Sequence, residues 1–272
     1  MTTTVITGGT DGIGRALAVH RLRRGGTVVV VGRSRTKFDA LVAAAGGSGS
    51  AHFIGADLRL VAENLRVAGE VATAFPVVDA LVLAAAYVHR KRVVTEEGFE
   101  HTFALHYLSR HLLATRLRPS LQAASAPLVL DTTVPGAPAD AVRWEDMQLE
   151  DGFTWKAANL HTRRLGLLSG LRVGTDHLRY ALYNPGFVRT AHQGALNGPE
   201  RAVVNLLGRT LGTAPEKAVL PLADLIGNRP DAPLSAYAGR KRLPLAIDAA
   251  DHADAERLHA VTEELPTPFA TR

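Results

Sequence analysis

A glycine-rich turn near the start of the chain has the residue types and spacing that bind a charged ligand. It reads Thr-Gly-Gly-Thr-Asp-Gly-Ile-Gly over residues 7–14, and it joins a short β-branched run to a helical segment that begins near Arg15. Glycines allow the backbone to turn tightly and to approach a pyrophosphate, whose charge is then met by N–H groups at the helix start. The order of strand, turn and helix predicts a dinucleotide-binding site. The residues expected to form it are Gly8, Thr10, Gly12, Ile13 and Gly14.

The end of the second expected strand indicates which dinucleotide is bound. A site that prefers NAD usually has an acidic residue here, which holds the 2′-hydroxyl of the ribose. The sequence has none at this point and offers Arg33, Ser34 and Arg35 instead. Because a guanidinium and a hydroxyl suit a 2′-phosphate, Arg33 and Ser34 favour NADP(H) over NAD(H). A solvated basic turn is the alternative interpretation.

The elements that must position this site alternate along the chain. Short β-branched or apolar runs stand between longer segments in which Leu, Ala and Val recur at helical spacing. Strands that alternate with helices imply βαβ units, and hence a parallel sheet covered on both faces. We therefore predict a doubly wound α/β fold, as a single domain over residues 1–272. The expected strands include residues 4–7, 27–31, 80–83, 128–130 and 178–182.

Composition excludes several classes of function. Apolar residues make up 46% of the chain and charged residues 21%, which is enough to build a core. The absence of cysteine excludes disulfides, thiolate metal sites and a cysteine nucleophile. The formal net charge of +5 is dispersed and names no partner, so neither nucleic acid nor a membrane is expected. No apolar run reaches the roughly 20 residues of a membrane span, and a strand begins by Val5, so we expect a cytoplasmic protein.

Several motifs in order along the chain resemble those of the short-chain dehydrogenase/reductase family, and most of all its retinol-dehydrogenase-like subgroup. The glycine-rich turn is similar to the family's cofactor motif, and residues 95–113 resemble its long interface helix with the lead-in. Residues 185–190 resemble a Pro-Gly-x-Val-x-Thr segment, and residues 255–265 resemble the subgroup's closing helix. The resemblance covers nearly the whole chain and implies a Rossmann-like sheet of about seven strands.

The resemblance also implies further contacts to NADP(H). Asp57 and Leu58 match the pair near the adenine ring, and Thr190 matches the threonine that meets the nicotinamide carboxamide. The family lysine, which binds the ribose, aligns with Lys156. The cofactor residues implied in this way are Asp57, Leu58, Ala84, Lys156, Pro185, Gly186, Val188 and Thr190.

The acid–base part of the family pattern is altered. Family members carry a tyrosine four residues before the lysine, and the lysine lowers the pKa of that phenol. Alignment on Lys156 puts Gly152 at the tyrosine position, and no tyrosine occurs between Tyr107 and Tyr180. The family's usual proton donor is therefore absent.

Three other positions have changed as well. The catalytic serine aligns with Thr132 or Thr133, of which we favour Thr133, and the asparagine of the interface helix aligns with His106. The usual Asn-Asn-Ala-Gly reads Leu-Ala-Ala-Ala over residues 83–86, and alanine cannot supply the amide hydrogen bonds.

Two residues are candidates to replace the missing donor. His106 is a candidate because an imidazole in water titrates near neutral pH, and Tyr87 is a candidate because it follows the altered residues 83–86 at the edge where α/β sheets bind ligands. A packed histidine and an ordinary pocket aromatic are the structural alternatives. The predicted catalytic set is made up of His106, Tyr87, Thr133 and Lys156. No metal site is expected, because His101, His106 and His111 recur every five residues and so spread around a helix.

Three functions remain open at this point. The first is an atypical NADP(H)-dependent oxidoreductase that acts on a carbonyl or alcohol of an apolar small molecule, held under a loop at residues 191–210. The second is a non-redox enzyme on the same fold, such as a dehydratase, isomerase or cyclase. The third is a catalytically silent subunit that pairs with an active homologue. In the second, the cofactor would be structural, lost, or an electrostatic element of the pocket. The interface helices favour a homo-oligomer, although the resemblance to the retinol-dehydrogenase-like subgroup leaves room for a monomer.

Overall fold

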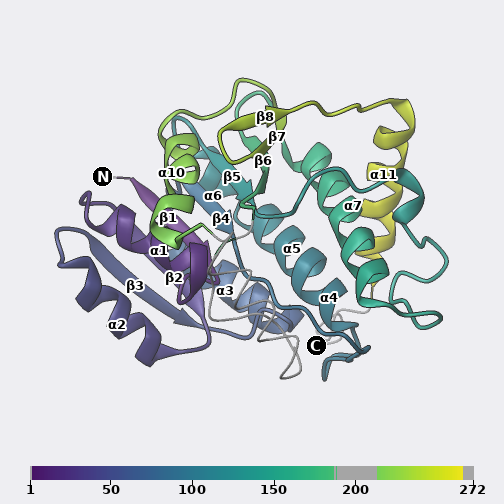
Figure 1. The fold of residues 1–272 in the computed structure, drawn as a ribbon, viewed down its shortest axis with the longest axis horizontal. Coiled ribbons are helices and arrows are strands. Elements are labelled where there is room, and N and C mark those ends of the chain that lie inside the picture. Colours follow the sequence, from purple (N-terminus) through teal and green to yellow (C-terminus); the bar gives the residue numbers. More distant parts are fainter. Residues whose placement is uncertain (1, 187, 189–212, 266–272) are drawn as a thin grey trace.

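A computed structural model describes residues 2–186, 188 and 213–265 of the chain. Over these residues the chain forms one eight-stranded sheet with the order β3-β2-β1-β4-β5-β6-β7-β8 (Figure 1). The first seven strands pair in parallel, and β8 pairs antiparallel with β7 at the edge. The strands are β1 (Thr3–Thr7), β2 (Thr27–Gly32), β3 (Ser50–Gly55), β4 (Ala80–Leu83), β5 (Leu128–Asp131), β6 (Arg179–Asn184), β7 (Leu234–Ala238) and β8 (Lys241–Leu243). The predicted doubly wound fold is confirmed.

Helices cover both faces of the sheet. On one face α3, α5 and α7 share a core with β1 residues such as Val5, and on the other face α1, α2 and α10 share a core with Ile6. Successive strand residues therefore point into opposite cores, as a sheet buried on both faces requires. The helices are α1 (Gly12–Leu22), α2 (Arg35–Ala45), α3 (Val61–Ala74), α4 (His101–Phe103), α5 (Ser109–Arg116), α6 (Arg118–Gln122), α7 (Trp155–Val173), α9 (Pro215–Ala218), α10 (Leu220–Gly227) and α11 (Ala249–Glu263), with a π-helical turn η1 (Ala104–Leu108) and a 3₁₀ turn η2 (Ala139–Ala141).

The expected interface helix is interrupted. It runs from α4 through the π-helical turn η1 into α5, so its hydrogen-bond spacing changes in the middle. Single π turns inside helices occur often at functional sites. The side chains of η1 are all buried, and its apolar ones belong to the core that α3, α5 and α7 form on one face of the sheet.

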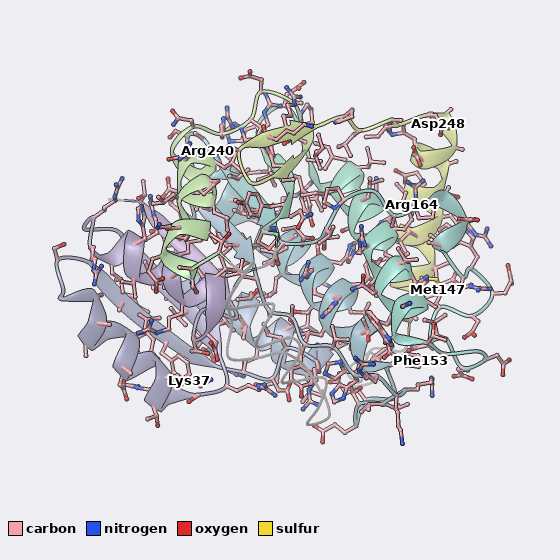
Figure 2. The ribbon with its side chains drawn as sticks, in the orientation of Figure 1. Lys37, Met147, Phe153, Arg164, Arg240 and Asp248 are labelled. Atoms are coloured by element: carbon pink, nitrogen blue, oxygen red, sulfur yellow. The ribbon has the colours of Figure 1, made fainter. Side chains whose placement is uncertain are left out.

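The closing helix α11 packs on α7. Arg164 of α7 and Asp251 of α11 form a buried ion pair, and Asp248 caps the start of α11. Figure 2 shows Arg164 on α7 and Asp248 at the start of α11. Tyr107 of η1 reaches the same helix, because its hydroxyl lies 2.5 Å from that of Thr262. One flank of α7 and η1 is thus covered by the chain's own C-terminal helix.

Candidate active site

A cavity of about 610 Å³ opens where the carboxyl ends of the central parallel strands meet. This is the edge at which open α/β sheets bind ligands. It is lined by residues that follow β1, β2, β3, β4, β5 and β6. Of the predicted site residues, those that line it are Gly8, Thr10, Gly12, Ile13, Gly14, Arg33, Ser34, Asp57, Leu58, Ala84, Tyr87, Pro185, Gly186 and Val188. Thr190 and the expected substrate loop at residues 191–210 lie outside the described residues.

The glycine-rich turn fits a ligand that approaches the backbone closely. Gly8 has a φ of +65°, and a Cβ atom there would lie 2.8 Å from the backbone of Ala85. A Cβ atom on Gly14 would lie 2.6 Å from the carbonyl oxygen of Gly8. Side chains at these positions would distort the turn that brings the first residues of α1 to the cavity wall. Asp11 caps the helix, since its carboxylate accepts from the N–H of Gly12 at 2.7 Å.

Basic side chains gather at the end of the cavity that follows β2 and β3. Arg33 is exposed at the wall, and Lys37 and Arg59 join it there. Lys37 Nζ lies 2.6 Å from the Asp11 carboxylate, and the guanidinium of Arg59 donates to both oxygens of Asp57. The hydrogen bonds from Arg59 hold the pKa of Asp57 below its usual value. The sequence interpretation missed Lys37 and Arg59, although their positions just past two strand ends were a signal.

Arg35 does not face this cavity. Its Nε lies 2.8 Å from Asp39 on the exposed side of α2, and its guanidinium sits 5.6 Å from the centre of the Phe38 ring. Ser34 caps α2 by accepting from the N–H of Lys37 at 3.3 Å. Two arginines two residues apart therefore have different surroundings, with only Arg33 at the cavity.

The segment after β4 is held by its backbone. The N–H groups of Ala84 and Ala85 donate to the hydroxyl of Thr7 at 3.0 and 3.2 Å. The N–H of Tyr87 donates to Nε2 of His106 at 3.2 Å. Burial, together with the charge of Arg110, lowers the pKa of His106 to about 3, so the ring is neutral at neutral pH. His106 is an acceptor beneath this segment and is not part of the cavity wall.

Thr133 belongs to a buried polar network. Nη1 of Arg110 donates to both the Asp131 carboxylate and the Thr133 hydroxyl. The Tyr180 hydroxyl donates to the other Asp131 oxygen at 2.7 Å, and burial beside this carboxylate raises the pKa of Tyr180 well above its usual value. Thr132, the neighbour that we did not favour, lines the cavity instead of Thr133.

Lys156 lies in the first turn of α7, which begins at Trp155 after a cap by Thr154. Its side chain is exposed, with Nζ 5.9 Å from the centre of the Trp155 ring, and it is not part of the cavity wall. Gly152 precedes the helix in a turn, with a φ of +66°. Among the described residues, the structure thus brings together Tyr87 and the predicted cofactor residues other than Lys156, but not Thr133 or His106.

Two further residues of the cavity wall are His101 and Asn184. His101 is buried, and burial lowers its pKa to about 4. Its ring lies 6.0 Å from that of Tyr87 and 4.3 Å from that of His89. Asn184 accepts from the N–H of Gly186 at 2.9 Å and so shapes the turn after β6. Within the described residues, no three carboxylate or imidazole groups are arranged to hold a metal ion.

Comparison with known proteins is consistent with this architecture. Residues 2–133 match the model of the short chain dehydrogenase family. Dehydrogenase/reductase SDR family member 12 of Bos taurus is 26% identical over 97% of this chain and 86% of its own length. Retinol dehydrogenase 14 of Mus musculus is 29% identical over 69% of this chain, an alignment that spans only 61% of that relative.

Solved structures share the fold. A short-chain dehydrogenase from Sphingobium yanoikuyae, in complex with NADPH, superposes with a TM-score of 0.64 at 18% identity, over 100% of this chain and 99% of its own. An alcohol dehydrogenase from Thermococcus sibiricus, complexed with 5-hydroxy-NADP, gives 0.65 at 20% identity, over 89% and 96%. None of the described helices is both long and apolar enough to cross a bilayer. By sequence motif, by the family match over residues 2–133 and by fold, the chain is similar to short-chain dehydrogenases/reductases.

Proposed function

We propose that the protein is an NADP(H)-dependent oxidoreductase that acts on a carbonyl or alcohol group of an apolar small molecule. The observation that carries the proposal is the single cavity wall that joins the glycine-rich turn, Arg33 and Tyr87. When bound, the nicotinamide would supply or accept the hydride. The relatives and neighbours named as dehydrogenases, two of them solved with an NADP-type ligand, support the same activity.

The cofactor would be held along its length by the residues of the wall. The first N–H groups of α1, around Gly12 and Gly14, would meet the pyrophosphate. Arg33 and Ser34 would take the 2′-phosphate, and Asp57 and Leu58 would flank the adenosine. Pro185, Gly186, Val188 and, from the resemblance, Thr190 would border the nicotinamide.

Tyr87 is the residue that we assign as proton donor. A carbonyl that accepts a hydride also needs one proton on its oxygen, and a phenol hydroxyl is a suitable donor. Tyr87 lines the cavity and is partly buried, and its backbone is fixed by His106. His106 fits this role less well, because an imidazole with a pKa near 3 holds no second proton at neutral pH. The predicted catalytic roles of Thr133 and Lys156 remain predictions.

Titration of protein fluorescence with NADPH and NADH tests the cofactor assignment. Arg33→Ala should weaken NADPH binding about 10- to 100-fold, as expected for the loss of a charge-assisted contact, and leave NADH binding unchanged. Arg35→Ala is the matched control, since Arg35 pairs with Asp39 away from the cavity and should leave both affinities unchanged. Absence of NADPH binding to the wild type, or equal effects of the two variants, would contradict the proposal.

A catalytically silent subunit is the second candidate. It is favoured by the exposed position of Lys156 and by the engagement of Thr133 with Arg110, since neither lines the cavity. NADPH binding with no turnover of any aldehyde or ketone in a broad panel would support it, as would co-purification with a homologue that has the family tyrosine. Turnover that Tyr87→Phe lowers about 100-fold would exclude it.

A further inference from the structure

His106 and Arg110 approach the segment after β4 from the same helical stretch. His106 stands in η1 and Arg110 in the first turn of α5. Nη2 of Arg110 donates to the carbonyl oxygen of Ala85 at 3.1 Å, and Nε2 of His106 accepts from the N–H of Tyr87 at 3.2 Å. Two side chains four residues apart therefore hold backbone groups on either side of Ala86.

This segment needs such support because of its sequence. Residues 84–86 are all alanine, so their side chains form no hydrogen bonds. Partly buried backbone groups must still be paired, and here the partners come from elsewhere in the chain. Thr7 accepts from Ala84 and Ala85, while Arg110 and His106 hold the next two groups.

Arg110 is fixed in turn by the strand ends. Its guanidinium donates to Asp131 and Thr133 at the end of β5, and Asp131 accepts from Tyr180 of β6. Asp131 is fully buried, so Arg110 is also its counter-charge. The position of Ala85 is thereby tied to two neighbouring strands.

We propose that His106 and Arg110 are positioning residues, a clasp that sets the segment from Ala85 to Tyr87 and so presents the Tyr87 side chain to the cavity. The clasp replaces amide side chains, which residues 83–86 lack. It rests on the proposed function only for the role of Tyr87, since the clasp itself is a matter of backbone geometry. His106 acts here as a neutral acceptor, with its ring proton on Nδ1.

Amide hydrogen exchange tests the clasp without cofactor or substrate. His106→Met removes the acceptor at similar volume, and it should speed exchange at the Tyr87 amide about tenfold or more, while β1 and β4 change little. His106→Gln offers an acceptor oxygen and should restore part of the protection. Unchanged exchange at Tyr87 in His106→Met would overturn the proposal.

A second variant tests the other arm of the clasp. Arg110→Met leaves the buried carboxylate of Asp131 without a counter-charge, so this variant could fail to fold. The double variant Arg110→Met/Asp131→Leu removes both charges and keeps the experiment informative in that case. Either should increase exchange over residues 84–88. Arg164→Met is the matched control, because Arg164 is also a buried arginine but pairs with Asp251 between α7 and α11. It should increase exchange in α11 and leave Tyr87 protected; the same effect on Tyr87 would contradict a specific clasp.

A kinetic arm applies once turnover is measured. His106→Met should lower kcat about tenfold with the KM for NADPH unchanged, because the clasp sets the donor and not the cofactor site. In a Tyr87→Phe background the same change should have no further effect on kcat. Additive losses would overturn the link between the clasp and Tyr87. If no NADPH binds, the proposed function fails while the exchange result still decides the clasp.

Discussion

At the scale of single residues, the cavity depends on positions where a side chain has no room. At Gly8 the turn lies so close to the segment after β4 that a Cβ atom would overlap with the backbone of Ala85. At Gly14 a Cβ atom would overlap with the backbone of Gly8. The same closeness exposes the first N–H groups of α1 to the cavity. Steric fit and phosphate recognition are thus properties of the same residues.

We expect Gly14→Ala to weaken NADPH binding about tenfold or more and to destabilise the fold by about 1–3 kcal/mol. The added methyl group would lie 2.6 Å from the Gly8 carbonyl oxygen, so the turn must move. Gly69→Ala is the control, because this glycine lies within α3 and a Cβ atom added there would have no atom from outside its own stretch of helix within 4 Å of it. It should stabilise the protein by about 0.5–1 kcal/mol and leave binding unchanged. Urea unfolding and NADPH titration measure both effects.

At the scale of elements, α7 and α11 are joined by two ion pairs with different surroundings. Arg164 and Asp251 are buried, whereas Arg172 and Glu256, 3.0 Å apart, are exposed. Coulomb attraction between exposed charges is weakened by water, and an unpaired buried charge is costly. The two pairs connect the same helices but differ in what their removal leaves behind.

We expect Arg164→Met to lower the free energy of unfolding by about 3–5 kcal/mol, and Glu256→Gln by less than about 1 kcal/mol. Asp248→Ala should fall between them, at about 1–2 kcal/mol, because Asp248 and Asp251 form a capping box at the start of α11. Chemical denaturation of the three variants gives the ranking. Equal losses at the buried and the exposed pair would contradict it.

At the scale of the whole molecule, buried histidines link the fold to pH. Burial lowers the pKa of four of them from 6.5 to between about 3 and 4. They lie in α4, η1, α5 and α7, elements that pack on the same face of the sheet. These histidines are His101, His106, His111 and His161.

Stability should therefore fall as the pH drops from about 6.5 to about 4. The unfolded chain takes up these protons near pH 6.5 and the folded chain does not until about pH 4, so the unfolded state holds more protons between those values. The loss should be on the order of a few kcal/mol. Urea unfolding at pH 7, 5.5 and 4.5 measures it. His111→Gln, which removes one such group, should give a shallower slope, and a flat wild-type profile would contradict the prediction.

The expected homo-oligomer also belongs to this scale and remains a prediction. Light scattering on the purified protein distinguishes a monomer of 29.0 kDa from a dimer or tetramer. Because α11 covers one flank of α7, a shared interface on α7 would have to use the remaining surface, where Leu160 is exposed.

The sequence by itself determined the sheet and the cofactor side of the cavity. Alternating β-branched runs and helical segments predict a doubly wound sheet, and β1, α1 and β2 follow one another so closely that Gly12, Gly14 and Arg33 are placed by local order alone. Such residues need only their own strand and helix to reach the cavity. The antiparallel β8 was missed because a three-residue edge strand has too short a pattern to read.

Only the tertiary structure decided which polar residues meet. Arg110, Asp131 and Tyr180 are far apart in the chain and belong to different elements. Asp131 nevertheless accepts from both Arg110 and Tyr180, and the same guanidinium of Arg110 donates to the Thr133 hydroxyl. The role of His106 likewise depends on an N–H group 19 residues away. Whether a hydroxyl faces a cavity or a buried guanidinium is set by packing between strands and helices, and no local pattern encodes that contact.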